Sequence, residues 1–266
     1  MTIIRVSALI LFSLCVAACS DDGPGEAQFP SRTVTVNGEV YAYRIYVPPG
    51  RDPNEKIPVM LYLHGSGSRG DDNRSQLAMA PVIRENPERF RFIIVFPQCR
   101  DGKFWSGEMN QQALAALDAT VAEFDGDVDR LYLGGFSMGG NGTWQNGLVH
   151  NGKFAALVPI AGQVAPSQKL SDEVLATLAP KLREAAISDD PYKVFAEGIG
   201  KTPVWVFHGS DDDLVPVSES RKIAAAFRNA DAAQVQFTEY AGDGHQIVGR
   251  VFGEPDLFKW LGKQRR

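Results

Sequence analysis

Five short apolar segments constrain the fold of this chain more than any other feature. Such nearly continuous runs are typical of strands that are buried on both faces, as in parallel sheets. They cover residues 59–64, 92–97, 130–135, 155–162 and 204–209. Helical patterns lie between them, for example in QLAMAPVIREN and QQALAALDATVAEF. This alternation predicts an α/β fold built on a mostly parallel, doubly wound sheet.

Two segments depart from the alternation. Asn37-Gly38 lies between two stretches of alternating polarity, a pattern that predicts an antiparallel hairpin at one edge of the sheet. Residues 164–201 form a longer connection with helical patterns of its own. We expect this connection to be either a small cap insertion over a site, which we favour, or a long crossover that carries an extra helix.

The length and composition suit one large globular domain or two small ones, and we predict one. The chain has 266 residues, of which 44% are hydrophobic, enough for a sizeable core over a predicted domain of residues 31–266. A net charge of −5 argues against a nucleic-acid-binding surface. Cys99 is the only cysteine in that domain, so no internal disulfide is expected, and we interpret it as a packed apolar residue.

The N-terminus has the pattern of an export signal. Arg5 precedes a short apolar run that ends in small residues, which predicts a signal peptide over residues 1–18. Val16-Ala17-Ala18-Cys19 resembles the bacterial lipobox, and this resemblance implies acylation of Cys19 and anchoring to a cell-envelope membrane. The alternative is an ordinary signal peptide that is cleaved nearby. Residues 19–30 are polar and contain Gly and Pro, so we predict a tether there.

Glycines surround one serine between a predicted strand and a predicted helix. Gly135-Phe136-Ser137-Met138-Gly139 has the G-x-S-x-G spacing. In this context the motif predicts a sharp turn that exposes the Ser137 hydroxyl as a nucleophile. The backbone N–H of Met138 is then a candidate oxyanion donor.

A nucleophilic serine needs a base and an acid. His245 follows the last predicted strand in a glycine-containing loop, so we predict it to be the general base. The acid should follow the strand over 204–209, where Asp211, Asp212 and Asp213 compete and spacing does not choose among them. His208, at the end of that strand, is interpreted as a packed histidine that bonds the loop backbone.

The loop after an early strand should supply the second oxyanion donor. In LYLHGSGSRGDDN the favoured donor is the backbone N–H of Ser66, with Gly67 as the alternative.

Taken together, LHGSGSRGDDN, FPQCRDGKFW, RLYLGGFSMGGNGTW, VWVFHGSDDDLVP and GDGH resemble the α/β-hydrolase superfamily. The likeness extends from about Thr33 to Trp260 and is strongest to predicted peptidases, feruloyl esterases and polyhydroxybutyrate depolymerases. It implies that Asp212, the fifth residue of the histidine-glycine motif, is the acid. It also implies that Phe104 and Trp105 either line the substrate mouth or belong to the core.

The expected activity is therefore that of a serine carboxylesterase that works through an acyl-enzyme on a small-molecule or polymer-derived ester, without cofactor or metal. The resemblance suggests a plant-wall phenolic, carbohydrate or polyester substrate. The alternatives are a serine peptidase on the same scaffold and a non-catalytic surface-binding lipoprotein.

Overall fold

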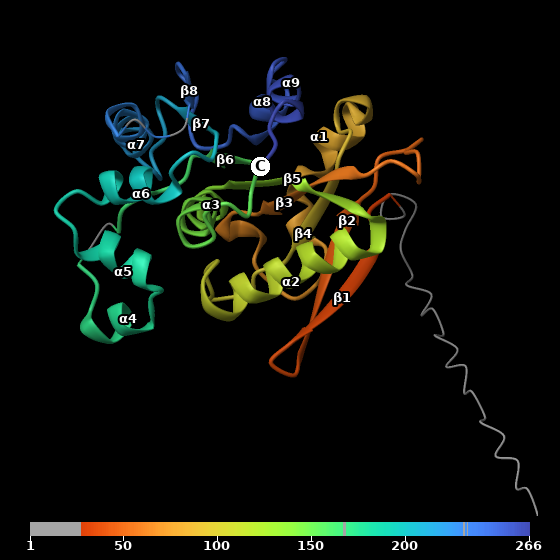
Figure 1. Ribbon diagram of the computed structural model, residues 1–266, viewed down its shortest axis with the longest axis horizontal. Helices are drawn as coiled ribbons and strands as arrows, with labels where there is room; N and C mark the ends of the chain where they lie inside the picture. The colour runs from red at the N-terminus through yellow and green to blue at the C-terminus, as the bar shows by residue number, and fades with distance from the viewer. Residues whose placement is uncertain (1–27, 167–168, 231, 233) are drawn as a thin grey trace, which may run out of the picture.

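An eight-stranded sheet forms the centre of the molecule (Figure 1). The computed structural model describes residues 28–166, 169–230, 232 and 234–266. Its strand order is β1-β2-β4-β3-β5-β6-β7-β8. β1 pairs antiparallel with β2, β2 pairs antiparallel with β4, and every other pair is parallel. The strands are β1 (Ser31–Val36), β2 (Glu39–Tyr46), β3 (Ile57–Leu63), β4 (Ile93–Pro97), β5 (Gly126–Phe136), β6 (Ala156–Ile160), β7 (Val204–Gly209) and β8 (Val235–Tyr240).

The apolar runs form strands because both faces of the sheet are covered. In β3, Val59, Leu61 and Leu63 face one buried cluster, whereas Met60 and Tyr62 face the other. Because side chains alternate between the faces of a strand, a strand covered on both sides is apolar at every position. The predicted α/β architecture is confirmed, and it is the α/β-hydrolase fold.

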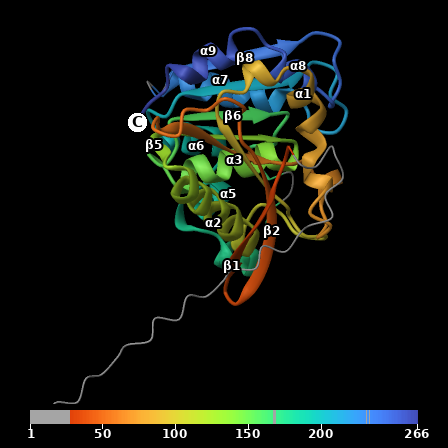
Figure 2. The ribbon, with the colours of Figure 1, turned by 90° about the vertical axis from the view of Figure 1, so that its right-hand side faces the viewer.

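Helices of different lengths cover the two faces (Figures 1 and 2). One face packs against α2 (Gly107–Phe124), α3 (Met138–Val149), α6 (Pro191–Ile199) and α7 (Ser218–Asn229). The other packs against α1 (Ala80–Glu85), α8 (Val248–Phe252) and α9 (Leu257–Gly262). The helix predicted over residues 76–86 begins as a 3₁₀ turn, η2 (Ser75–Met79), and becomes α-helical only in α1. Two more 3₁₀ turns are η1 (Ser66–Ser68) and η3 (Pro87–Arg89).

The predicted hairpin is confirmed. Val36 pairs with Glu39, so Asn37 and Gly38 form a two-residue turn, and both have positive φ, 51° and 86°. A two-residue turn with φ above zero at both positions matches the twist of the flanking strands.

One residue of the predicted tether packs into the core. The sequence indicates a tether up to residue 30, but the side chain of Phe29 is fully buried and packs against Tyr46 and Phe96. Phe29 lies close to β1, so its ring reaches the core. The polar composition of the tether does not reveal this burial. The predicted signal peptide, Cys19 and residues 20–27 of the tether lie outside the described residues.

The described part of the long connection over residues 164–201 contains three helices. They are α4 (Asp172–Thr177), α5 (Pro180–Ile187) and α6. One of the helical patterns of this connection covers residues 171–186 in the sequence. The structure breaks it before Pro180, because a residue that precedes proline is disfavoured in the α conformation. α6 packs into the core through Phe195, whereas α4 and α5 lie at the edge of the molecule (Figure 1). We call residues 170–187, which contain α4 and α5, the insert.

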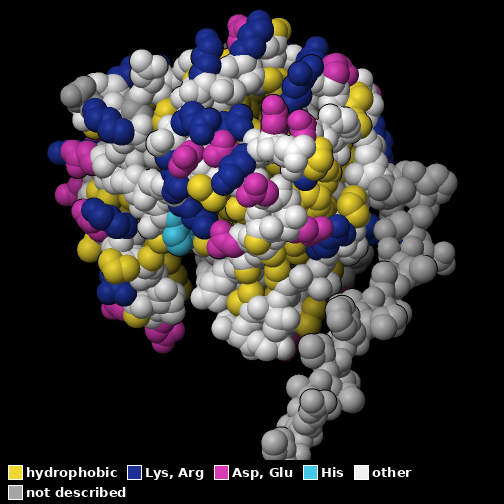
Figure 3. Space-filling view, turned by 45° about the vertical axis from the view of Figure 1, so that its right-hand side comes forward, with side chains coloured by type: hydrophobic (Ala, Val, Ile, Leu, Met, Phe, Trp, Pro, Cys, Tyr) yellow, Lys and Arg dark blue, Asp and Glu magenta, His cyan; other side chains and the backbone are white. Residues whose placement is uncertain are grey.

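The face of the molecule drawn in Figure 3 shows no field of one charge over the described residues. On the face in Figure 3, Lys and Arg side chains are interspersed with Asp and Glu side chains. Within the part of the chain that the structure describes, no helix combines the length and the apolarity needed to cross a bilayer.

Candidate active site

Ser137 occupies the sharp turn between β5 and α3. Its backbone has φ 56° and ψ −115°, a conformation that costs a non-glycine residue about 1–3 kcal/mol. The surrounding backbone leaves no room for a side chain at either glycine of the motif. A Cβ on Gly139 would lie 1.8 Å from the carbonyl oxygen of Leu63, and one on Gly135 would lie 2.3 Å from that of Gly139. The two glycines of the motif are therefore required by close approach of backbone to backbone.

The structure brings together Ser137, His245 and Asp212 from three separate loops. His245 Nε2 lies 2.8 Å from Ser137 Oγ, and His245 Nδ1 lies 2.7 Å from Asp212 Oδ2. Because the carboxylate accepts from Nδ1–H, Nε2 of the neutral ring is left to accept the hydroxyl proton. His245 is 8% exposed and its ring also packs against Phe136.

Backbone amides, as well as His245, hold the Asp212 carboxylate in place. Its side chain is fully buried, and Oδ1 accepts hydrogen bonds from the amides of Leu214 at 2.9 Å and Val215 at 2.8 Å. Burial by itself would raise the pKa of Asp212, but the hydrogen bonds from His245 and from the two amides outweigh it, so the pKa lies below its usual value. Asp211 and Asp213 are exposed. Of the three aspartates, Asp212 contacts His245, and it is the one that the resemblance implies.

His208 makes a contact that sequence reasoning missed. The expected bond to the loop backbone is present, since Nε2 lies 2.9 Å from the carbonyl oxygen of Val215. Nε2 also lies 3.1 Å from Asp212 Oδ2, the oxygen that His245 contacts. Nδ1 lies 2.7 Å from Ser220 Oγ. Both neighbours of Nε2 are acceptors, so Nε2 carries the proton and Nδ1 accepts from the Ser220 hydroxyl.

His208 is therefore a neutral donor to the buried carboxylate. It is fully buried, and this burial lowers its pKa, although Val215 and Asp212 act in the opposite direction. The only signal in the sequence is its place four residues before Asp212, at the end of the same strand. That spacing does not reveal that the loop after β7 brings the side chain of Asp212 back to within 3.1 Å of His208.

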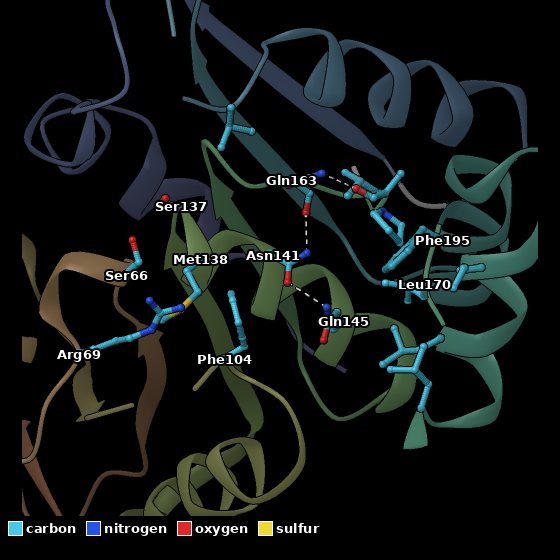
Figure 4. Close-up of a pocket in the computed structure, with 18 residues that line it drawn as sticks. Ser66, Arg69, Phe104, Ser137, Met138, Asn141, Gln145, Gln163, Leu170 and Phe195 are labelled. Atoms are coloured by element: carbon cyan, nitrogen blue, oxygen red, sulfur yellow. Dashed lines mark hydrogen bonds between the residues drawn. The ribbon is translucent and has the colours of Figure 1, made fainter. Parts of the chain in front are cut away.

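The predicted oxyanion donors lie beside Ser137 (Figure 4). Met138 is the first residue of α3, so its amide has no acceptor within the helix. Ser66 begins η1, and the backbone before it is anchored through His64. The His64 ring bonds the Gly65 carbonyl oxygen at 2.7 Å and the Cys99 amide at 3.0 Å. Cys99 is buried, as interpreted from the sequence.

Two cavities open from Ser137. The first, about 680 Å³, extends toward the insert, and we call it the insert-side cavity (Figure 4). The second, about 690 Å³, contains His245 and Val248, and we call it the histidine-side cavity. Ser66 and Ser137 line both.

The two aromatic residues that the resemblance singled out have different environments. Phe104 is 61% exposed and lines the insert-side cavity, where Arg69 lies 4.7 Å above its ring. Trp105 is buried, and its indole N–H donates to the His64 carbonyl oxygen at 3.0 Å. Phe104 therefore lies at the mouth and Trp105 in the core. Among the residues described, no group of three or more His, Cys, Asp or Glu side chains is arranged to hold a metal ion.

Comparison with known proteins identifies the family. The model of the prolyl oligopeptidase family matches residues 103–259, a segment that contains Ser137, Asp212 and His245. The chain belongs to this family. An uncharacterized secreted protein of Arthroderma benhamiae is 25% identical over 246 residues, which are 82% of this chain and 25% of that protein.

Two solved structures share the fold of this family member. A thermostable esterase has a TM-score of 0.70 and 26% identity, over 90% of this chain and 64% of that one. A ferulic acid esterase has a TM-score of 0.64 and 19% identity, over 88% of this chain and 98% of that one. The chain thus spans a quarter of the secreted relative and just under two thirds of the thermostable esterase. The family is named for peptidases and both structures for esterases, so membership does not separate the two activities.

Proposed function

We propose that this family member is a serine hydrolase that cleaves carboxylic esters through an acyl-enzyme intermediate. The observation that carries the proposal is the unbroken chain of hydrogen bonds from Ser137 Oγ through His245 to Asp212, at 2.8 and 2.7 Å. These distances lie in the range in which a base takes a proton from a nucleophile.

In the proposed reaction, Ser137 Oγ attacks the ester carbonyl carbon while its proton passes to His245 Nε2. Asp212 holds the ring in the Nδ1–H tautomer and stabilises the imidazolium that forms. The amides of Met138 and Ser66 donate to the oxyanion of the tetrahedral intermediate, a contribution of about 2.7–4 kcal/mol for each donor. The C–O bond to the alcohol breaks as His245 returns its proton to the leaving oxygen. Water, activated by the same ring, then hydrolyses the acyl-enzyme.

A serine peptidase is the second candidate, because the matching family is named for prolyl oligopeptidase. The experiment that separates the two compares p-nitrophenyl acetate with a peptide p-nitroanilide on the same purified protein. The proposal expects kcat/KM for the ester to exceed that for the anilide by at least about 10³-fold, a difference of about 4 kcal/mol in the barrier. A higher kcat/KM for the anilide would establish the peptidase instead.

We expect His208 to act as a positioning residue for Asp212. Removing its N–H in His208→Leu leaves the carboxylate with one donor fewer, so the carboxylate attracts the proton on His245 more strongly. The acid limb of the kcat/KM profile should then move to higher pH, and the maximum should fall by about tenfold. His208→Gln keeps an N–H donor, so its acid limb should lie closer to that of wild type and its maximum kcat/KM should be higher than that of His208→Leu. A His208→Leu profile with an unmoved acid limb would leave His208 with a packing role only.

We also propose, from the sequence, that residues 1–18 are removed on export, that Cys19 is lipid-modified, and that residues 164–201 include a cap. Incorporation of labelled palmitate into the wild type but not into Cys19→Ser is the expected result for the anchor. Labelling of Cys19→Ser would refute it.

A further inference from the structure

We propose that the two cavities at Ser137 divide the substrate: the insert-side cavity takes an uncharged, aliphatic acyl group of medium length, and the histidine-side cavity takes the alcohol. This inference rests on the proposed function and adds a substrate class to it.

The division follows from where His245 lies. The leaving oxygen must receive its proton from His245 Nε2, so the alcohol must lie on the side of that ring. His245 lines the histidine-side cavity and not the insert-side cavity. With the oxyanion directed at Met138 and Ser66, the remaining substituent of the tetrahedral carbon, the acyl chain, points into the insert-side cavity.

The chemistry of the cavity wall selects the acyl group. The wall formed by the insert and α6 is apolar, and five of its six side chains are aliphatic: Leu170, Leu178, Leu182, Ala185, Ala186 and Phe195. Among the described residues that line the cavity, Arg69 is the one that carries a charge, and it lies with Phe104 on the side away from Leu170 and Phe195 (Figure 4). A buried charge on the acyl group would have no partner at the apolar end, and such burial is strongly unfavourable. At about 680 Å³ the cavity is of the size that holds small-molecule ligands and is much larger than an acetyl group needs.

The near wall is held by a row of amide side chains. Gln145 Nε2 donates to Asn141 Oδ1 at 2.9 Å, and Asn141 Nδ2 donates to the carbonyl oxygen of Gln163 at 3.0 Å (Figure 4). Gln163 Nε2 donates in turn to the carbonyl oxygen of Ala165 at 2.7 Å. These bonds join α3 to the start of the long connection that carries the insert.

A carboxylate on α7 fastens the same connection at two points. Glu219 Oε2 accepts from the amides of Val164 at 3.0 Å and Ala165 at 3.1 Å. Glu219 Oε1 accepts from the hydroxyl of Tyr192, on α6, at 2.6 Å. The segments on both sides of the insert are thus tied to the core, and a wall whose flanks are fixed loses less ordering entropy on binding.

The test crosses two substrate series with one variant in each cavity. The acyl series compares p-nitrophenyl octanoate with p-nitrophenyl acetate, and the alcohol series compares 1-naphthyl acetate with phenyl acetate. We expect wild type to prefer octanoate to acetate by about tenfold or more in kcat/KM, because each methylene buried in the transition state adds to the discrimination. Ala186→Trp, which fills the insert-side cavity, should lower the octanoate-to-acetate ratio by at least about tenfold and leave the naphthyl-to-phenyl ratio within about twofold.

Val248→Trp, in the histidine-side cavity, is the matched control. It should lower the naphthyl-to-phenyl ratio by at least about tenfold and leave the octanoate-to-acetate ratio within about twofold. Leu182→Ala enlarges the insert-side cavity, so it should move the preference from octanoate toward dodecanoate, and it avoids the overpacking that a tryptophan introduces. If Ala186→Trp lowers the naphthyl ratio instead, or if neither Ala186→Trp nor Leu182→Ala alters the acyl ratio, the division is wrong. A wild type that hydrolyses no ester would instead refute the proposed function, so the two failures are distinguishable.

Discussion

Ser137→Ala is expected to lower kcat for p-nitrophenyl acetate by about 10⁴-fold or more, because alanine has no oxygen with which to form the acyl-enzyme. The fold should be little affected. The variant loses the 2.8 Å contact with His245 Nε2, and one such hydrogen bond contributes about 1 kcal/mol. For a chain of this size we therefore expect Tm to fall by no more than about 4 °C.

Two measurements on the same preparations check this prediction. Initial rates on the ester give the loss of activity, and a fluorophosphonate probe should label wild type but not Ser137→Ala. Ser75→Ala is the matched control, because Ser75 is exposed and its hydroxyl bonds Asp72 rather than a residue of the site. Most of the wild-type rate surviving in Ser137→Ala would show that the nucleophile lies elsewhere. A folded wild type that the probe does not label would favour a binding protein.

Asp212→Asn is expected to lower kcat by about 10⁴-fold, whereas Asp211→Asn and Asp213→Asn should each change it by less than about threefold. An amide at position 212 can donate an N–H to His245 Nδ1. The ring proton then lies on Nε2, and in this tautomer Nε2 cannot accept the proton of the Ser137 hydroxyl. The other two carboxylates are exposed, and Asp211 bonds the Ser210 hydroxyl instead.

The three asparagine variants should be compared at one pH near 7, with Tm measured for each. The pKa of Asp212 lies below its usual value, so the stability that this carboxylate supplies is present above its unfolded pKa of about 4 and is lost as the pH falls through its folded pKa. Asp212→Asn lacks this stabilisation at neutral pH, so its loss of rate reports the tautomer of His245 when its Tm shows that the variant is folded at the assay temperature. Equal losses at all three positions would contradict the choice of Asp212.

Much of the fold could be predicted because its causes are local. A strand that is buried on both faces is apolar at every position, so β3 to β7 are visible as continuous runs. The Asn37-Gly38 turn and the turn at Ser137 are also visible, because backbone geometry there demands particular residues, as the 1.8 Å approach to Gly139 shows. The burial of Phe29 and the break before Pro180 were not anticipated, because an isolated apolar ring and a single proline carry little periodic signal.

The sequence by itself determined the sheet, the hairpin and the candidate nucleophile, since each depends on residues close together in the chain. Only the tertiary structure decided that Asp212 rather than its neighbours meets His245, that His208 shares that carboxylate, and that two cavities meet at Ser137. The reason is distance along the chain: His245 is separated from Asp212 by 33 residues and from Ser137 by 108. Three adjacent aspartates are equivalent until folding buries one beside the ring and leaves the other two in water.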